Sequence, residues 1–203
     1  MSLPAVQFPN RISFEDFLAT IDEDTHVEWV DGQVVPMTPV SRQHDEVVGF
    51  IYAILRGFIR RKKIGGHAFH DSFQMKLGAA RSSRVPDVGY VRPERGHLLH
   101  DTYMDGPADL AVEVVSLESR TRDRVEKFRE YQQAGVLEYW LIDPAHELAE
   151  AYRLSPSGIY EPVGLGDPAR LTCEALPGFW IDVAWLWQED TDEWVAYEAW
   201  GLI

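Results

Sequence analysis

One short apolar run, Leu110–Val115, constrains the fold more than any other segment of the chain. Its sequence, LAVEVV, is almost continuously apolar, which predicts a strand that is buried on both faces of a sheet. The run contains one carboxylate, Glu113, and a buried carboxylate is costly unless a charged group lies beside it. The pattern therefore predicts a covered sheet that holds one polar site in its interior.

Local signals predict helices and strands before and after this run. Ser13 and Ser41 are typical N-cap residues, the first before a short helix and the second before a long amphipathic one. Asp31-Gly32 supplies the positive φ values of a tight β-hairpin turn. The expected strands cover residues 27–30, 33–37, 67–77, 85–91, 110–115, 138–142, 148–154 and 159–163. The long helix after Ser41 covers residues 42–62, and two further helices cover 120–134 and 182–187. We expect a single α+β domain over residues 1–203, with helices flanking a mixed β-sheet.

The composition indicates the cellular compartment of the protein and excludes several classes of protein. Hydrophobic residues make up 45% of the chain, which excludes an intrinsically disordered protein. The single cysteine, Cys173, excludes an internal disulfide framework and a cysteine-based zinc cluster. The first residues lack the pattern of a secretory signal, and the longest apolar stretch is amphipathic and interrupted. We therefore expect a cytoplasmic protein without a membrane span.

The charge distribution bears on whether the chain binds nucleic acid. The net charge of −14 is unfavourable, because phosphate binding depends on Lys and Arg. However, residues 51–130 hold 15 of the 19 basic residues against 11 of the 33 acidic ones, a local balance of +4. A basic middle permits a phosphate-facing side, although an ordinary solvated surface explains it equally well. The residues expected to follow a nucleic-acid backbone are Arg60, Arg61, Lys62, Lys63, Arg81, Arg84, Arg92, Arg120 and Arg124.

Three residues form the candidate site. Asp87 begins a strand, Glu113 lies in the buried run, and Lys127 is on a helix that a short loop would fold over the strand end. Two carboxylates beside a lysine can hold a divalent cation and activate water, which suits phosphodiester cleavage. Each residue also has a structural interpretation. Asp87 is compatible with a turn, Glu113 with a salt bridge to arginine, and Lys127 with an i, i+4 pair on its helix.

His44 and Glu28 are candidates for the rim of the same site. His44 lies in the first turn of the long helix and Glu28 in the hairpin, where each could be a second metal ligand, a phosphate contact or a surface residue. The other histidines have no zinc-binding spacing. The sequence also lacks His-Glu-x-x-His, a phosphate-binding P-loop motif and a serine nucleophile elbow. These absences argue against a zinc protease, a P-loop nucleotidase and a serine hydrolase.

The motifs together resemble a known family. They are Glu28-Trp29-Val30-Asp31-Gly32, His44 at a helix start, Pro86-Asp87-Val88, Ala111–Pro144 and Leu176-Pro177-Gly178-Phe179. Over about residues 13–187 the chain is similar to the large bacterial Uma-type family of restriction-endonuclease-like proteins, in the PD-(D/E)XK nuclease superfamily. The resemblance implies a restriction-endonuclease-like core and a metal-dependent phosphodiesterase site, with Asp87 and Glu113 as ligands of Mg²⁺ or Mn²⁺.

The chain departs from the superfamily pattern at one position. The pattern places a lysine two residues after the second acid on the same strand, where this chain has Val115. The resemblance implies that Lys127 on the following helix supplies the amine instead, a migration similar to what this family shows. If Lys127 does not reach the site, metal binding could survive without catalysis.

Three functional hypotheses follow. The first is a metal-dependent endonuclease that acts on nucleic acid, with DNA as the main expectation. The second, favoured by the acidic balance and the aromatic tail, is a catalytically inactive module on the same fold that binds nucleic acid or a protein. The third is hydrolysis of a small phosphorylated substrate. The sequence leaves the oligomeric state open, and Trp194, Trp200 and Ile203 favour a homodimer.

Overall fold

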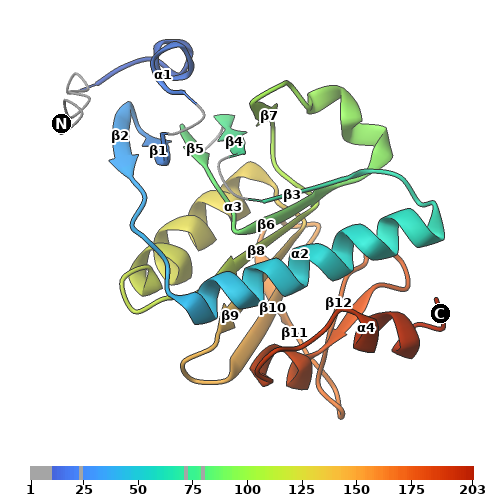
Figure 1. Ribbon diagram of the computed structural model, residues 1–203. Helices are drawn as coiled ribbons and strands as arrows, with labels where there is room; N and C mark the ends of the chain where they lie inside the picture. The colour runs from blue at the N-terminus through green and yellow to red at the C-terminus, as the bar shows by residue number, and fades with distance from the viewer. Residues whose placement is uncertain (1–10, 23–24, 71–72, 79–80) are drawn as a thin grey trace.

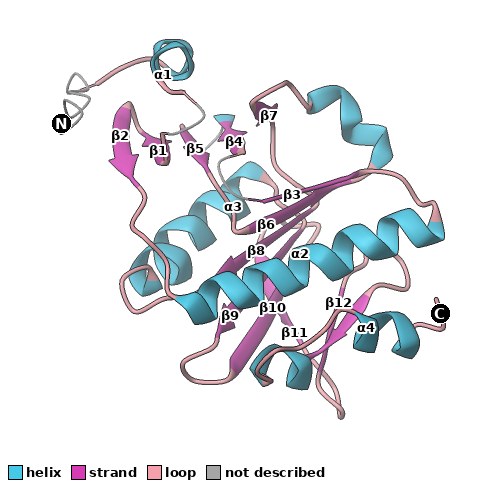
Figure 2. Ribbon diagram, viewed as in Figure 1, coloured by secondary structure: helices cyan, strands magenta, loops and turns pink. Residues whose placement is uncertain are grey.

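The computed structural model describes residues 11–22, 25–70, 73–78 and 81–203, and its main element is a six-stranded sheet. The strand order is β11-β10-β9-β8-β6-β3, and only the pair β8 and β9 is parallel, so the sheet is mixed (Figures 1 and 2). Its strands are β3 (His67–His70), β6 (Val88–Val91), β8 (Leu110–Val114), β9 (Glu138–Asp143), β10 (Leu148–Leu154) and β11 (Tyr160–Val163).

Side-chain alternation along β8 places its residues against two different layers. Leu110, Val112 and Val114 pack in the hydrophobic cluster that contains helix α2 (Arg42–Lys62). Ala111 belongs to the opposite cluster, which contains residues of helix α3 (Phe128–Ala134). Because neighbouring side chains on a strand point to opposite faces, Glu113 lies on the α3 side. Every residue of β8 is buried, which confirms the two-sided burial that the apolar run predicts.

The helices begin and end as their local sequences predict. The Ser41 hydroxyl accepts a hydrogen bond from the His44 amide at the start of α2, and Ser13 caps α1 (Phe14–Thr20) through the Asp16 amide. Between β8 and β9 the chain forms a π-helical turn, η3 (Arg122–Lys127), which continues into α3. Gly135 ends α3 with a φ of 89°, a conformation that glycine adopts without steric cost.

A second sheet lies beside the first and carries part of the site. It has the order β2-β1-β5-β4-β7, with the hairpin β1–β2 turning through Asp31-Gly32 as expected. Its strands are β1 (Val27–Val30), β2 (Gln33–Pro36), β4 (Gln74–Leu77), β5 (Ser82–Arg84) and β7 (Tyr103–Asp105). The chain passes from β5 into β6 of the main sheet through residues 85–87. Asp87 therefore lies where the chain crosses between the two sheets.

The C-terminal region covers the α2 side of the main sheet (Figure 1). It consists of β12 (Arg170–Thr172), β13 (Trp180–Asp182), the 3₁₀ helix η4 (Val183–Trp187) and α4 (Trp194–Ala199). Trp200 packs against Phe58 and Phe179, with ring centroids 5.0 and 5.3 Å apart, so it serves the core rather than an exposed surface. Trp194 and Ile203 remain about half exposed. A homodimer stays a prediction that rests on these two residues.

The expected α+β fold with a mixed sheet is confirmed, but two strand predictions are wrong in detail. The strand expected over 67–77 is two strands, β3 and β4, which belong to different sheets. The strand expected over 85–91 begins only at Val88, because residues 85–87 make the crossing between sheets. The sequence signals also missed β5, β7, β12, β13, α4 and the 3₁₀ helix η2 (Pro93–Leu98). In the described part of the chain, no helix has the length and apolar character needed to cross a bilayer.

Candidate active site

Asp87 is anchored at the point where the main sheet meets the crossing from β5. Its Oδ2 accepts a hydrogen bond of 2.6 Å from the backbone amide of Val114, the residue that follows Glu113 on the adjacent strand. This bond fixes the Asp87 carboxylate next to the end of β8. About a fifth of the side chain is exposed to solvent. The two acids that the sequence singles out therefore meet at one end of the sheet.

Glu113 lies under the helical layer and makes two strong contacts there. Its Oε2 accepts a hydrogen bond of 2.8 Å from the Lys127 ammonium, and its Oε1 accepts one of 2.6 Å from the Tyr131 hydroxyl. All three side chains are almost completely buried. The partner that the buried carboxylate requires is thus the lysine on the following helix, and not an arginine.

The π-helical turn η3 presents two of its polar residues to the sheet. Asp123 and Lys127 are both buried, although helical turns of this polarity usually face solvent. A π turn is wider than an α-helical turn, and such turns are found frequently at functional sites. The Lys127 ammonium also donates to the Val85 carbonyl at 3.1 Å and lies 3.3 Å from Glu28 Oε1. Lys127 therefore joins the helix, the crossing segment and the second sheet.

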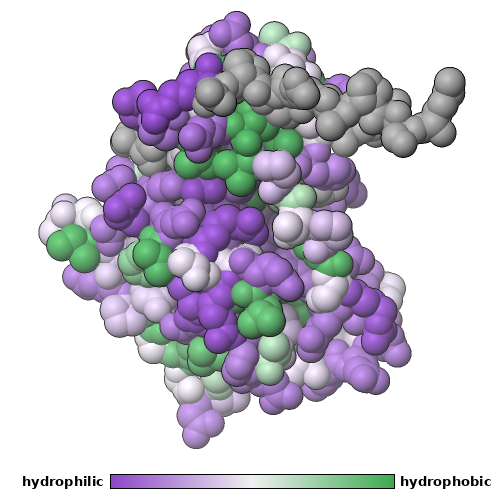
Figure 3. Space-filling view, turned by 90° about the vertical axis from the view of Figure 1, so that its left-hand side faces the viewer, coloured by the Kyte–Doolittle hydropathy of each residue, from purple (hydrophilic) through white to green (hydrophobic). Residues whose placement is uncertain are grey.

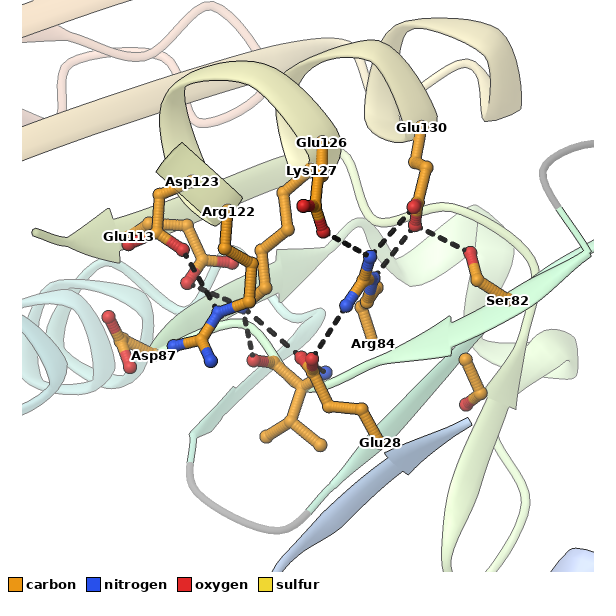
Figure 4. A network of polar contacts seen from close by, with 12 residues as sticks. Glu28, Ser82, Arg84, Asp87, Glu113, Arg122, Asp123, Glu126, Lys127 and Glu130 are labelled. Carbon is orange, nitrogen blue, oxygen red and sulfur yellow. Dashed lines mark hydrogen bonds and ion pairs between the residues drawn. The ribbon is translucent and has the colours of Figure 1, made fainter. Parts of the chain in front are cut away.

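Glu28 links the site to a buried arginine that sequence reasoning placed elsewhere. Arg84 donates to Glu28 at 2.8 Å and makes a bidentate pair with Glu130, with both distances at 2.7 Å (Figure 4). The Ser82 hydroxyl completes this network by donating to Glu130. Lys127 and Arg84 outweigh the effect of burial and lower the pKa of Glu28 to about 2. Glu28 is therefore an ionised link between Arg84 and Lys127.

His44 reaches the site from the opposite layer. It is buried in the first turn of α2, and its Nε2 lies 3.3 Å from Asp87 Oδ2. Burial disfavours the charged imidazolium, but the hydrogen bond and charge of Asp87, with a contribution from Asp123, outweigh burial and raise the pKa of His44. The structure thus brings together all five residues named from the sequence.

The charges in this cluster favour an added cation. Burial raises the pKa of Glu113 well above its usual value, Asp87 and Asp123 add to this effect, and Lys127 opposes it. Burial alone would lower the pKa of Lys127, but Glu113, Glu28 and the two aspartates outweigh it and raise that pKa. The ammonium therefore stays protonated. The carboxylates around it repel one another, and an additional positive charge would relieve that repulsion.

The donor set fits a hydrated divalent cation. Asp87 and Glu113 supply the hard oxygen ligands that Mg²⁺ prefers. Asp123 Oδ1 is buried and has no hydrogen-bond partner within the described residues, which is unusual for a buried polar atom. In the same part of the chain, no three His, Cys, Asp or Glu side chains are grouped so that they could hold an ion by themselves. Water and backbone oxygen would have to complete the coordination, as is common for Mg²⁺.

A cavity of about 250 Å³ adjoins the site. It lies between the start of α2 and the loops after β8 and β9, and His44 and Val115 line it. Arg120, Asp143 and His146 form part of its wall. Figure 3 shows the face of the molecule that carries the start of α2, and this face is mostly hydrophilic, with one contiguous hydrophobic patch in its upper part and separate hydrophobic side chains elsewhere. The site is therefore reached from a polar surface.

The basic residues expected to follow a nucleic-acid backbone are not arranged as one track. Arg84 is fully buried, so its assignment to a phosphate-facing surface is wrong. Arg92 pairs with the buried Asp109 at 3.0 Å, and Arg120 pairs with Asp143 at the same distance. The cluster Arg60–Lys63 lies at the C-terminal end of α2, whereas His44 is at its start, about 25 Å away for a helix of this length. Most of these cations serve the fold or lie far from the carboxylates.

Comparison with known proteins supports a nuclease-like interpretation of this geometry. Residues 14–184 match the model of the Uma2 family, which is described as putative restriction endonucleases. The chain belongs to this family. The matched range contains all five candidate residues, from Glu28 to Lys127. The family relationship that the sequence motifs indicate is therefore confirmed.

A solved structure shares the fold. It is the crystal structure of a putative nuclease of the family DUF820 from Anabaena variabilis, which superposes with a TM-score of 0.71 at 16% sequence identity. The alignment covers 87% of this chain and 97% of the other. At this identity the likeness shows the fold alone. No curated protein matches the chain.

Proposed function

We propose that this Uma2 family member is a metal-dependent endonuclease that hydrolyses phosphodiester bonds of nucleic acid, with DNA as its substrate. One observation carries the proposal most directly. The buried pair of Glu113 and Lys127, 2.8 Å apart, lies at the strand end where Asp87 is anchored by the Val114 amide. Two carboxylates and an ammonium at one point are the groups that metal-assisted hydrolysis requires. Membership of a family of restriction-endonuclease-like proteins supports the same reaction class.

Asp87 and Glu113 would hold Mg²⁺ or Mn²⁺, which supplies polarisation of the scissile phosphate and a bound water of lowered pKa. Lys127 stays protonated between its acidic neighbours, so it serves to stabilise negative charge rather than to accept a proton. Glu28 holds the lysine in place from the second sheet. His44 orients the Asp87 carboxylate from the α2 side.

A cleavage assay tests the proposal. Purified protein is incubated with supercoiled plasmid, linear duplex, single-stranded DNA and RNA, each with Mg²⁺, with Mn²⁺ or with EDTA. The proposal predicts metal-dependent cleavage of circular DNA, which shows endonucleolytic action because a circle has no ends. If folded protein cleaves none of these substrates with either metal, the proposed endonuclease activity is contradicted. Cleavage of RNA alone would support metal-dependent phosphodiester hydrolysis but show that the substrate is RNA and not DNA.

An inactive binding module is the second candidate, and the net charge of −14 favours it. Metal-dependent thermal stability distinguishes the two. If Asp87 and Glu113 bind Mn²⁺, a hundredfold excess over the dissociation constant stabilises the fold by about 2.7 kcal/mol, or roughly 5–10 °C in melting temperature. We expect this shift for the wild type and its loss in Asp87→Ala. A melting temperature unaffected by Mn²⁺ at millimolar concentration supports the inactive module.

The metal affinity is expected to rise with pH. The pKa values of Glu113 and His44 are both raised in the metal-free protein. Burial raises the pKa of Glu113, whereas burial opposes and Asp87 produces the raised pKa of His44. A cation binds the carboxylate of Glu113 only after that group has lost its proton. A cation at Asp87 also removes the negative charge that stabilises the imidazolium of His44, so metal binding releases protons from both groups. Calorimetric titration with Mn²⁺ between pH 5.5 and 8.5 should show tighter binding at each higher pH, by up to about tenfold per unit for each proton released. An affinity that is constant over this range contradicts the expectation.

A further inference from the structure

Asp123 is a buried acid that the proposed reaction has not yet used. It lies in the first turn of η3, is 1% exposed, and shares the inner side of the turn with Lys127. Its Oδ1 has no hydrogen-bond partner in the described part of the chain, and the nearest cation is Arg122 Nε at 3.6 Å. Figure 4 shows the Asp123 carboxylate beside Glu113, under the same helical turn. A carboxylate oxygen left unsatisfied in this position is costly unless a ligand binds it.

His44 borders the same cluster from the opposite layer. His44 is 8% exposed, and its Nδ1 is buried without a hydrogen-bond partner among the described residues, while its Nε2 faces Asp87. The two unsatisfied atoms come from different layers, η3 above the sheet end and α2 below it. Because Nε2 faces Asp87, Nδ1 is directed away from it, so Asp123 Oδ1 is the unsatisfied atom that borders the two acids.

The balance of charge gives the sign of the missing group. Arg84 is one cation shared by two acids of the buried network, Glu28 and Glu130. Among the described residues, Lys127 lies 2.8 Å from Glu113 and Arg122 Nε lies 3.6 Å from Asp123, so three cations face five carboxylates when Asp87 is counted. An excess of buried carboxylate oxygen selects a cation and not an anion.

We infer that Asp123 is a third acid of the metal centre and holds the water shell of the divalent cation that Asp87 and Glu113 bind. This inference rests on the proposed function. Direct coordination by all three acids is not what the structure favours, because the described residues contain no group of three side chains arranged around one ion. A carboxylate that accepts hydrogen bonds from metal-bound water fulfils the same role and suits Mg²⁺, which usually retains several waters. Asp123 is thus a positioning residue for the hydrated cation.

The test is the Mn²⁺ affinity of Asp123→Asn, measured by calorimetry on the full chain. Asparagine keeps the size of the side chain and removes the charge. We expect the affinity to fall by about 10- to 100-fold, the usual effect of losing an outer-sphere partner. The melting temperature of the metal-free variant should equal or exceed that of the wild type, because a buried carboxylate with an unsatisfied oxygen is removed. A purely structural acid would instead lower the metal-free melting temperature and leave the affinity unchanged.

Glu126→Gln is the matched control, since Glu126 lies on the same turn with its side chain 56% exposed and directed at Arg84. It should bind Mn²⁺ as the wild type does. Asp123→Ser gives a second, smaller replacement if the asparagine variant is poorly folded. Wild-type affinity in a folded Asp123 variant, with binding lost in Asp87→Ala, overturns this inference and leaves the proposed function intact. Absence of Mn²⁺ binding by the wild type overturns both.

Discussion

Asp87→Asn is expected to abolish metal-dependent cleavage while leaving the fold intact. Asparagine retains one oxygen that can accept the Val114 amide hydrogen bond, so the end of β8 keeps its anchor. The substitution removes the negative charge that a divalent ion needs at this position. Because metal activation contributes several kcal/mol to transition-state stabilisation, the cleavage rate should fall by about 10³-fold or more. The rate is measured on supercoiled plasmid at saturating Mg²⁺, and circular dichroism monitors the fold.

Asp45→Asn is the control for this experiment. Asp45 is next to His44 in sequence but is exposed on the outer side of α2. Its replacement makes the same change of charge near the same helix start and should leave the cleavage rate within about twofold, as surface substitutions generally do. Undiminished cleavage by Asp87→Asn, or equal losses in both variants, would contradict the assignment of Asp87 as a metal ligand.

Lys127→Met is expected to lose both cleavage and a large part of the folding stability. Methionine has nearly the shape of lysine but leaves Glu113 and Glu28 without the ammonium that lies 2.8 and 3.3 Å from them. Breaking a buried ion pair by removing one partner typically costs about 3–5 kcal/mol. Urea denaturation measures this loss, and Lys62→Met, at the exposed end of α2, is the matched control with an expected change below about 0.5 kcal/mol.

A double variant separates the structural role of Lys127 from its role in catalysis. Adding Glu113→Gln to Lys127→Met removes one of the stranded charges, so part of the stability should return, with a coupling of about 1–3 kcal/mol. Cleavage should not return. A single Lys127→Met variant with wild-type stability would show that the ion pair is unimportant in solution. A double variant that regains cleavage would exclude Glu113 and Lys127 from the reaction.

The sequence predicts the carboxylates of the site because their signals are local. The apolar run around Glu113 identifies a buried strand, and strand alternation places the acid under the following helix. The spacing of Asp123, Lys127 and Tyr131 places them on one side of that helix, and the structure buries all three. Asp123 is not among the site residues named from the sequence, although its spacing of four residues before Lys127 was an available signal.

The position of the lysine also has a physical explanation in the structure. Val115 lies two residues after Glu113, so alternation places both on the α3 side, and Val115 packs in the hydrophobic cluster there. An apolar residue at this position leaves the acid without a partner from its own strand. Lys127 then approaches the same carboxylate from the helix above. Lys127, and not a residue of the same strand, is therefore the cation paired with Glu113.

The Arg84 network could not be predicted from sequence. Arg84 is 46 residues from Glu130 and 56 residues from Glu28, and the three come from α3, β1 and β5. Only the packing of two sheets against one helix brings them together. Local patterns instead placed Arg84 among exposed cations. The division of residues 67–77 between two sheets was missed for the same reason, since strand pairing over long separations has no local signal.

Diffraction from crystals soaked in Mn²⁺, recorded at a wavelength where manganese scatters anomalously, tests the central claim most directly. If Asp87 and Glu113 hold the metal, one strong anomalous peak lies about 2.0–2.4 Å from carboxylate oxygens of both residues, at the sheet end beneath η3. The Lys127 ammonium should lie near this peak without coordinating it. A peak elsewhere on the molecule, or none at this sheet end at millimolar Mn²⁺, would show that Asp87 and Glu113 do not form a metal site.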